Sequence, residues 1–556
     1  MATELATDPG GRFPIPATST EPLLALRCAP AIRPYLPEDA VQSSTTSPTE
    51  ILFDAPIVFS EIANAVPITL GPGTLDVTIS INGKQIASGA VPLNATKHAL
   101  PIFALRFEAS GGGFTATELL TYLPDPPADI GSVTKFDART GALLARPLGG
   151  SKTAPFEPVF PFGFYTGFQN YLQTNFSTAL PELKSQGFTV VRSILHFQGF
   201  NVVTGTKVHI IPAFPPSIAD LQETLDEMEK VGIYLIYDMR GQVFSCPVAH
   251  SESSCVHCCR TYMNDSSVTE QVNDIKKRTN LLIWYTADEP DGTSDPLNAT
   301  LLSANLINSL DGGDGLGGAG YHPISLVLNC ENYEFTAYTS GADVVLQDTY
   351  TIGNNLNFST VWGTVCNDTY GDCGCDNCHT GFPDISTRMD EFKERLFING
   401  WELTKSVWAV PQGFGNETYW PRYPTGREWV LQSVLGINHG GVGVTSWDDP
   451  TTADIKASAS DFALAMKTMK EFILSTTATF KQVTFANGID VGLWTVADQT
   501  LVLATNINYE DLSISLAQLD LSGSVHQVFD SGVSLSSNSR TLHFGSVGSG
   551  GFIVTK

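Results

Sequence analysis

An acidic pair at the end of an apolar run is the first feature of this sequence that could do chemistry. Residues 281–285 are apolar or aromatic, Asp288 and Glu289 follow them, and Pro290 and Gly292 come next. An apolar run of this length between breakers is typical of a fully buried strand in a parallel sheet. Barrels of alternating strands and helices build their active sites at the C-terminal ends of such strands. We therefore predict that Glu289 is a general acid and that Asp288 is its nearest functional partner.

Further polar and aromatic residues stand at the ends of other predicted strands. Cleavage of a glycosidic bond needs an acid that protonates the leaving oxygen and a second group that deals with the oxocarbenium-like carbon. Flat aromatic rings can stack on sugar faces. Carboxylates combined with aromatic residues therefore favour a glycan substrate. We expect seven residues to bind it: Asp238, Asn329, Glu331, Asp348, Tyr350, Gln412 and Trp447.

The elements that must position these side chains alternate between strands and helices from about 155 to 475. Eight strands are predicted, at 158–166, 188–197, 233–240, 281–290, 324–329, 342–350, 406–414 and 441–447. Helical patterns lie between and after them, for example at 217–232, 385–400 and 454–474. Eight strands alternating with helices predict a (β/α)8 TIM barrel.

Two regions of alternating, strand-like pattern flank the predicted barrel. We expect an N-terminal β-sandwich over residues 1–150, with a hairpin at Asn82-Gly83, and a C-terminal β-sandwich over residues 479–556. The chain has 556 residues, which is too long for one ordinary domain. The predicted organisation is therefore a barrel between two sandwiches.

The charge balance limits the partners. The formal net charge of −26 disfavours nucleic acid and anionic membranes, and no apolar run reaches the length of a membrane span. An uncharged oligosaccharide or polysaccharide remains compatible with this charge, whereas the oligomeric state stays open. No metal site or organic cofactor is expected, because the glycine-rich string at 313–318 does not follow a strand into a helix.

The ten cysteines fall mostly in two clusters, within 246–259 and 366–378. Two pairs, Cys255 with Cys258 and Cys375 with Cys378, have a spacing found in zinc sites, but we favour disulfides that stiffen long loops. Seven Asn-x-Ser/Thr sequons accompany them. Together these features indicate an extracellular, secreted protein, although the sequence shows no signal peptide at its N-terminus.

The motif Asp288-Glu289-Pro290 resembles the acid/base motif of barrel glycoside hydrolases of clan A, in which Glu follows Asn and often precedes Pro. Tyr350 and Trp447 also resemble substrate-contacting positions of that clan. Those enzymes carry a nucleophilic Glu at the end of strand 7, where this sequence has Gln412. An amide cannot form the glycosyl-enzyme ester, so the resemblance departs from the standard retaining mechanism.

Two mechanisms remain open. The adjacent Asp and Glu are similar to the pair in glycoside hydrolase family 123, which implies that Asp288 polarises the substrate's acetamido group and that Glu289 is the acid/base. The other mechanism is inversion, with Glu289 as acid and Asp348, Glu331 or Asp238 as base. An alternative from another functional class is a carbohydrate-binding or cell-wall protein whose barrel has lost catalytic activity.

Overall fold

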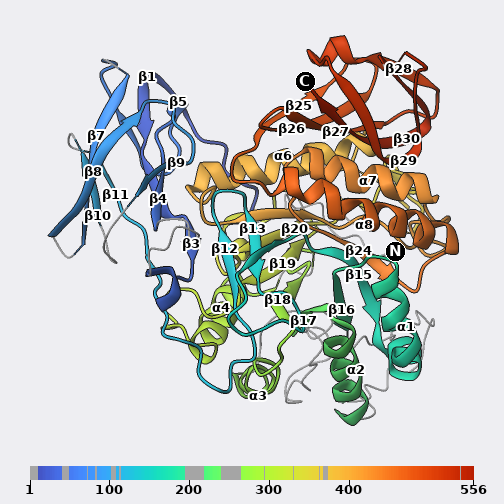
Figure 1. Ribbon diagram of the computed structural model, residues 1–556, viewed down its shortest axis with the longest axis horizontal. Helices are drawn as coiled ribbons and strands as arrows, with labels where there is room; N and C mark the ends of the chain where they lie inside the picture. The colour runs from blue at the N-terminus through green and yellow to red at the C-terminus, as the bar shows by residue number, and fades with distance from the viewer. Residues whose placement is uncertain are drawn as a thin grey trace.

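The computed structural model describes thirteen stretches of the chain and is shown in Figure 1. They are residues 11–40, 49–71, 73–81, 84–101, 108–111, 114–194, 218–239, 265–292, 295–329, 331–361, 363–366, 373–538 and 540–556. The predicted cysteine cluster within 246–259 and the turn Asn82-Gly83 lie outside the described residues.

A closed barrel of eight parallel strands forms the centre of the molecule, which confirms the predicted fold class. Neighbours in the barrel are also consecutive along the chain, and the last strand pairs with the first. The strands are β15 (Phe162–Gly167), β16 (Val190–Ile194), β17 (Tyr234–Asp238), β18 (Leu281–Asp288), β19 (Ile324–Leu328), β20 (Val344–Gln347), β23 (Ser406–Ala409) and β24 (Val444–Asp449).

One α-helix follows each barrel strand, so the wall of the barrel is covered on the outside (Figure 1). The helices are α1 (Gln173–Ser185), α2 (Ile218–Val231), α3 (Asp265–Ile275), α4 (Ala299–Leu310), α5 (Phe335–Thr339), α6 (Phe382–Asn399), α7 (Gly426–Asn438) and α8 (Ala453–Ile473). A short π-helix, η2 (Phe168–Leu172), precedes α1, and a two-stranded ribbon of β21 (Phe358–Ser359) and β22 (Thr364–Val365) lies between β20 and α6. No helix in the described part of the chain is long and apolar enough to cross a membrane.

Burial on both faces explains why the apolar runs form the barrel strands. All eight residues of β18 are buried, because one face meets the barrel interior and the other meets the helices. Capping side chains then define where helices begin. The Thr425 hydroxyl accepts a hydrogen bond from the Glu428 N–H at the start of α7, and the Glu428 carboxylate accepts one from the Thr425 N–H.

The first barrel strand begins later than the sequence predicts. Residues Glu157–Val159 form β14, which pairs antiparallel with β13 outside the barrel, and β15 begins at Phe162. Pro161 separates the two strands, and it has no N–H to continue a ladder.

Four small antiparallel sheets make up the N-terminal part of the chain. They contain β5, β1 and β6; β2, β4 and β9; β11, β10, β7 and β8; and β14, β13, β12 and β3. In chain order the strands are β1 (Thr18–Ala25), β2 (Arg27–Pro30), β3 (Ile32–Arg33), β4 (Glu50–Asp54), β5 (Ile57–Ser60), β6 (Ala65–Pro67), β7 (Thr74–Ile81), β8 (Lys84–Pro92), β9 (His98–Pro101), β10 (Glu108–Gly111), β11 (Phe114–Ala116), β12 (Thr134–Asp137), β13 (Ala142–Ala145) and β14 (Glu157–Val159), with the 3-10 helix η1 at Pro37–Ala40. Strands β7 and β8 pair antiparallel on either side of the predicted hairpin turn.

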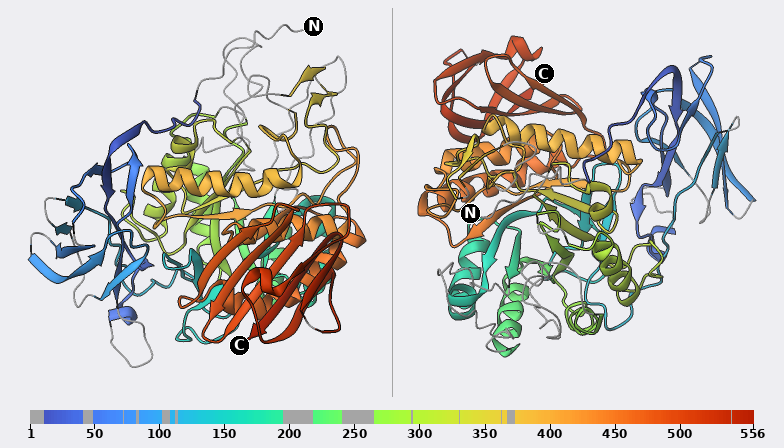
Figure 2. Two further views of the ribbon diagram at one scale, coloured as in Figure 1. Left: turned by 90° about the horizontal axis from the view of Figure 1, so that it is seen from above. Right: turned by 180° about the vertical axis from the view of Figure 1, so that it is seen from behind.

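The C-terminal part is one continuous six-stranded antiparallel sheet. Its strands are β25 (Thr479–Thr484), β26 (Ile489–Val496), β27 (Gln499–Asn506), β28 (Leu512–Ser515), β29 (Ser524–Leu535) and β30 (Thr541–Thr555), with the 3-10 helix η3 at Leu516–Leu519. The long strand β30 joins its two halves, because it pairs with β28, β27 and β29. Figures 1 and 2 show this sheet over α7 and α8, and the N-terminal sheets on another side of the barrel.

Candidate active site

The acidic pair lies at the C-terminal end of β18, on the side where the other strand ends carry polar residues. Thr286 is skipped in the register between β18 and β19, which marks a β-bulge. In a regular strand, residues 285 and 288 would point to opposite faces. The bulge turns both side chains to the same side, and the Tyr285 hydroxyl donates a 2.7 Å hydrogen bond to Asp288 Oδ1.

Arg192, from β16, joins the carboxylates of two neighbouring strands. Its guanidinium lies 3.3 Å from Asp288 Oδ1 and 3.6 Å from Asp238 Oδ2. The rings of Tyr285 and Tyr165 lie 3.1 and 3.8 Å from its guanidinium carbon. Arg192 is thus a buried cation held between two aromatic rings and two acids.

Asp238 is the deeper of these two acids. Its side chain is 1% exposed, and it accepts a 2.5 Å hydrogen bond from the Tyr165 hydroxyl. The side chain of Asp288 is 11% exposed. Asp238 is therefore part of the floor beneath the acidic pair, and Asp288 is the more accessible carboxylate.

Glu289 has a backbone conformation that glutamate seldom adopts. Its φ is +49°, in the left-handed region, and its N–H donates to the Val327 carbonyl oxygen at 3.1 Å. A left-handed residue other than glycine costs about 1–2 kcal/mol, and such strain gathers at functional sites. The strain at Glu289 therefore supports the prediction that this residue acts on a substrate.

Asp348, just after β20, is hydrogen-bonded to Glu289. Burial, the charge of Glu289 and this hydrogen bond raise the pKa of Asp348 well above its usual value. A raised pKa favours the protonated form of Asp348, and in that form Asp348 can donate the hydrogen bond to Glu289. The other carboxyl oxygen, Oδ1, is buried and has no hydrogen-bond partner among the described residues, which leaves an acceptor for a ligand.

The pKa of Asp288 is also raised. Burial is the main cause, the nearby Arg192 opposes it, and the charges of Glu289 and Asp238 add to it. Arg192 is the one cation that contacts these four acids within the described part of the chain. Closely spaced acids with one cation share protons, and such pKa shifts are typical of functional sites.

Two predicted aromatic positions lie at the same end of the barrel. Tyr350 is buried, and the acids Asp348, Glu289 and Asp288 add to burial in raising its pKa. Trp447, in β24, lies against Tyr165 with ring centroids 4.0 Å apart and ring planes tilted by 43°. Both rings therefore belong to the surroundings of the acids, and their contact with substrate stays a prediction.

The side-chain amide of Gln412 forms hydrogen bonds with the protein itself through both its nitrogen and its oxygen. Its Nε2 donates to the carbonyl oxygens of Ile352 and Phe414 at 3.0 and 3.2 Å, and its Oε1 accepts from the Ile352 N–H at 3.0 Å. These bonds hold the segment after β20 against the segment after β23. They give Gln412 a structural task and leave its predicted contact with substrate without support.

The two predicted residues that follow β19 have different surroundings. Asn329 lies beside the turn after Glu289, since its N–H donates to Asp291 Oδ1 at 3.2 Å. Glu331 instead forms an ion pair with Arg395 at 3.2 Å and interacts with Glu391. Its described contacts include neither Glu289 nor Asp348, so the structure does not bring Glu331 into the acidic cluster.

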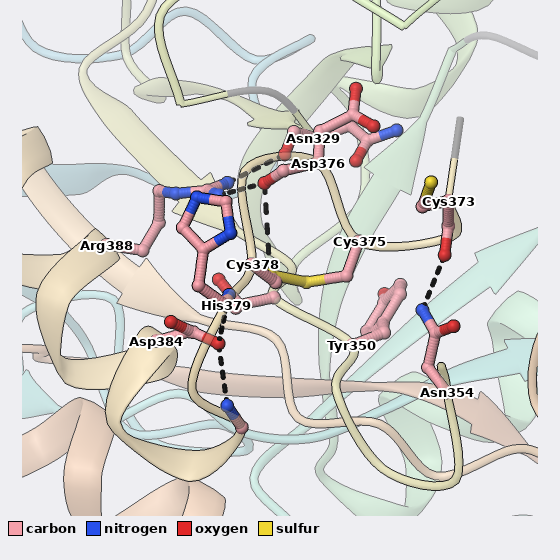
Figure 3. The surroundings of a disulfide bond; sticks show 12 residues. Asn329, Tyr350, Asn354, Cys373, Cys375, Asp376, Cys378, His379, Asp384 and Arg388 are labelled. Atoms are coloured by element: carbon pink, nitrogen blue, oxygen red, sulfur yellow. Dashed lines mark hydrogen bonds between the residues drawn. A yellow bond between two sulfur atoms is a disulfide. The ribbon is translucent and has the colours of Figure 1, made fainter. Parts of the chain in front are cut away.

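A disulfide-bonded loop is attached to the end of β19. Its bonds are Cys366–Cys373 and Cys375–Cys378, which supports the predicted disulfides in this cluster. Arg388 of α6 donates to the carbonyl oxygens of Asn329 and Asp376 at 2.7 and 2.5 Å. Figure 3 shows Tyr350 beside this loop. The loop therefore stands next to residues of the candidate site.

Three residues of the site were not predicted: Tyr165, Arg192 and Tyr285. The sequence does contain one signal for them, because Arg192 interrupts the apolar pattern of its strand. An arginine at such a position needs acidic partners, and those partners are distant in sequence. Among the described residues, no group of three or more His, Cys, Asp or Glu side chains could hold a metal ion.

No family model matches the sequence, and no curated protein matches it significantly. Solved structures of glycoside hydrolases are similar to the chain over most of their own length. A family 30 endoxylanase from Clostridium papyrosolvens C71 is 10% identical, with 74% of this chain and 98% of that chain covered and a TM-score of 0.40. An α-amylase from Geobacillus thermoleovorans complexed with acarbose is 10% identical, with 69% of this chain and 92% of that chain covered and a TM-score of 0.43. A trehalose-6-phosphate hydrolase from Bacillus licheniformis is 9% identical, with 71% of this chain and 98% of that chain covered and a TM-score of 0.43. Similarities of this size carry no argument about activity, which must come from the site.

Proposed function

We propose that this protein is a glycoside hydrolase in which Glu289 is the general acid/base. The observation that carries the proposal is the hydrogen bond between Glu289, in its strained left-handed conformation, and the buried Asp348, whose pKa is raised by burial and by Glu289. Both residues belong to the C-terminal ends of barrel strands, where this fold places active sites. Aromatic rings nearby suit a sugar substrate.

The arrangement of acids argues against inversion. An inverting pair holds a water between carboxyl groups about 6.5–9.5 Å apart, whereas Asp348 is hydrogen-bonded to Glu289. Asp238 is held by Tyr165 and Arg192, and Glu331 is paired with Arg395. None of the three predicted bases is therefore free to activate a water.

Participation of a substrate acetamido group needs no second carboxylate base. Glu289 would protonate the glycosidic oxygen while the acetamido carbonyl oxygen attacks the anomeric carbon and the bond to the leaving group breaks. Asp288 would accept a hydrogen bond from the acetamido N–H, because Tyr285 and Arg192 both bind its Oδ1 and hold the side chain in place. Glu289 would then take a proton from the water that attacks the anomeric carbon. This attack breaks the bond between that carbon and the acetamido oxygen. The substrate class that we propose is a glycan with N-acetylhexosamine.

Asp348 has a clear task in this sequence of steps. After Glu289 gives up its proton, its carboxylate is left beside buried acids. A neutral Asp348 donates a hydrogen bond to this carboxylate and stabilises it. The same hydrogen bond helps to fix the orientation of the Glu289 side chain.

The disulfides of the 366–378 loop form most readily in an oxidising compartment, and on that ground we propose that the protein is secreted.

The test is hydrolysis of aryl β-N-acetylglucosaminide and β-N-acetylgalactosaminide by the wild type and Glu289→Gln. Loss of the acid/base should lower kcat by about 10²–10⁴-fold. The matched control is Glu331→Gln, which changes a glutamate outside the acidic cluster and should keep kcat within about threefold, as for a substitution with no part in the chemistry. A thiazoline derived from N-acetylglucosamine should inhibit the wild type. Activity without this inhibition would exclude acetamido participation.

A non-catalytic carbohydrate-binding protein is the second candidate, because the amide of Gln412 stands where a nucleophile would be expected by resemblance. Such a protein would retain glycans in the wild type and hydrolyse none of them.

A further inference from the structure

An open groove of about 550 Å³ lies on the C-terminal sheet, apart from the acidic cluster of the barrel. Strands β28, β29 and β30 contribute its lining. Its volume lies within the range of small-molecule sites, which is about 300–1,000 Å³.

One end of the groove carries three polar side chains from adjacent strands. Ser513 and Ser534 both stand opposite His543 in the sheet, and the Ser513 hydroxyl lies 2.8 Å from His543 Nδ1. All three residues are exposed. They offer donors and acceptors at the spacing of neighbouring strands.

The other end of the groove is hollow because two glycines form it. A Cβ added at Gly532 would lie 2.9 Å from the guanidinium carbon of Arg427, so this glycine lets the arginine lie against the sheet. A Cβ added at Gly545 would have Arg427 NH1 at 3.6 Å and Asp511 Oδ1 at 3.9 Å. A cation and a carboxylate thus border the same empty space.

Arg427 is exposed, and its guanidinium makes no hydrogen bond or ion pair with the described residues. Asp530, also in the lining, already accepts the N–H groups of Gly532 and Val533. Tyr509, two residues before Asp511, has a ring that is 60% exposed and a hydroxyl bonded to Glu428, the residue after Arg427. Donors and acceptors therefore border the groove, and Tyr509 lies outside its lining.

The groove lies beside the N-terminus of helix α7, because Arg427 contacts the glycines of the groove. Helix α7 follows β23, so its N-terminus, with Arg427, stands at the C-terminal ends of the strands. The acidic cluster of Glu289 occupies that same end.

We propose that this groove is a second binding site for an uncharged oligosaccharide segment. Arg427 and His543 donate to sugar hydroxyls, and Asp511 accepts from them. Two carboxylates against one guanidinium make the groove unfavourable for anionic chains. This inference goes beyond the proposed function, since the groove would bind a glycan whether or not Glu289 cleaves it.

The experiment is electrophoresis of the full chain through gels that contain soluble starch, arabinoxylan, galactomannan or polygalacturonate. Glu289→Gln is the parent, so that no polysaccharide is consumed. At least one of the three neutral polysaccharides should retard it. An added Cβ at Gly545 meets no backbone atom closer than 3.5 Å, so Gly545→Leu should occupy the groove and weaken retardation about tenfold, as the loss of roughly 1.4 kcal/mol would do. Arg427→Ala should act in the same direction.

Gly71→Leu is the matched control, because an added Cβ there meets nothing within 4 Å and lies in the N-terminal part. It should be retarded like the parent. The proposal is overturned if no neutral polysaccharide retards the parent, if polygalacturonate does so instead, or if Gly545→Leu and Arg427→Ala bind as the parent does. Because hydrolysis is not measured, a failure of the catalytic proposal would leave this result unaffected.

Discussion

Asp348 and Glu289, from the ends of two different barrel strands, are joined by a hydrogen bond. A hydrogen bond between two acids requires at least one proton, and the raised pKa of Asp348 favours its protonated form; Glu289 must carry a second proton when it acts as the general acid. The pair therefore works as one unit whose charge depends on pH.

The first prediction concerns Asp348→Asn. The raised pKa means that Asp348 is neutral at low pH and ionises as the pH rises through its folded value. Ionisation removes the donor and adds a charge beside Glu289, so wild-type activity should fall on the alkaline side. An amide keeps a donor and cannot ionise. The variant should keep kcat/KM within about tenfold at its optimum and extend activity to higher pH. A pH profile with an unchanged alkaline limb would contradict the assignment.

The second prediction concerns the backbone strain at Glu289. Glycine tolerates a φ of +49° and brings no charge to the acidic cluster. Glu289→Gly relieves this strain but also removes the hydrogen-bond partner of Asp348, so the two effects should largely offset each other and the free energy of unfolding should fall by no more than about 1 kcal/mol while activity is lost. Urea unfolding of both proteins measures this change. A larger loss of stability would mean that the glutamate serves the fold.

The third prediction concerns Arg192. Its removal would break the buried ion pairs of Arg192 with Asp238 and Asp288, and breaking a buried ion pair by removing one partner costs about 3–5 kcal/mol. Arg192→Met should lower Tm and abolish activity, whereas Arg192→Lys should recover part of both. The matched control is Arg540→Met, since Arg540 is exposed. Equal Tm values for the two methionine variants would refute the structural role.

The fourth prediction separates the two possible roles of Gln412. Gln412→Leu leaves the buried N–H and carbonyl of Ile352 without their partner, at a cost of about 1–3 kcal/mol. The expected result is a lower free energy of unfolding with KM nearly unchanged. A large rise in KM with unaltered stability would instead restore the substrate contact that the sequence suggested.

The fifth prediction concerns the junction of the barrel with the C-terminal sheet. His439 follows α7 and contacts Asp390 at 2.7 Å and Asp490 of β26 at 3.0 Å. Burial alone would lower its pKa, but the hydrogen bonds to these two acids raise the pKa of His439 to about 9.

The folded pKa of His439 lies above its ordinary value of 6.5. Its contribution, about 2–3 kcal/mol, is therefore complete below pH 6.5 and is lost as the pH rises through about 9. His439→Gln should lower Tm at pH 6 and flatten the decline between pH 6.5 and 9. His526→Gln is the control, because His526 is an exposed histidine on the same sheet. A wild-type Tm that does not fall over this interval would exclude the role of His439.

The sequence was most informative about features that depend on the pattern of a single strand. The apolar run before Asp288 and Glu289 is buried on both faces, and that burial produces the same pattern in each barrel strand. Tyr350 and Trp447 could be placed near the acids for the same reason, since each lies close to the end of such a run. Gln412 and Glu331 also stand just beyond strand ends, but hydrogen bonds and an ion pair with other segments direct their side chains elsewhere.

The order of strands and helices, the acidic pair and the barrel were therefore determined by local pattern, because burial and periodicity act over a few neighbouring residues. The hydrogen bond between Asp348 and Glu289, the bulge that turns Tyr285 toward Asp288, and the position of Arg192 were decided only by the tertiary structure. These contacts join residues of different strands through angles and distances set by closure of the barrel. No spacing along the chain encodes them.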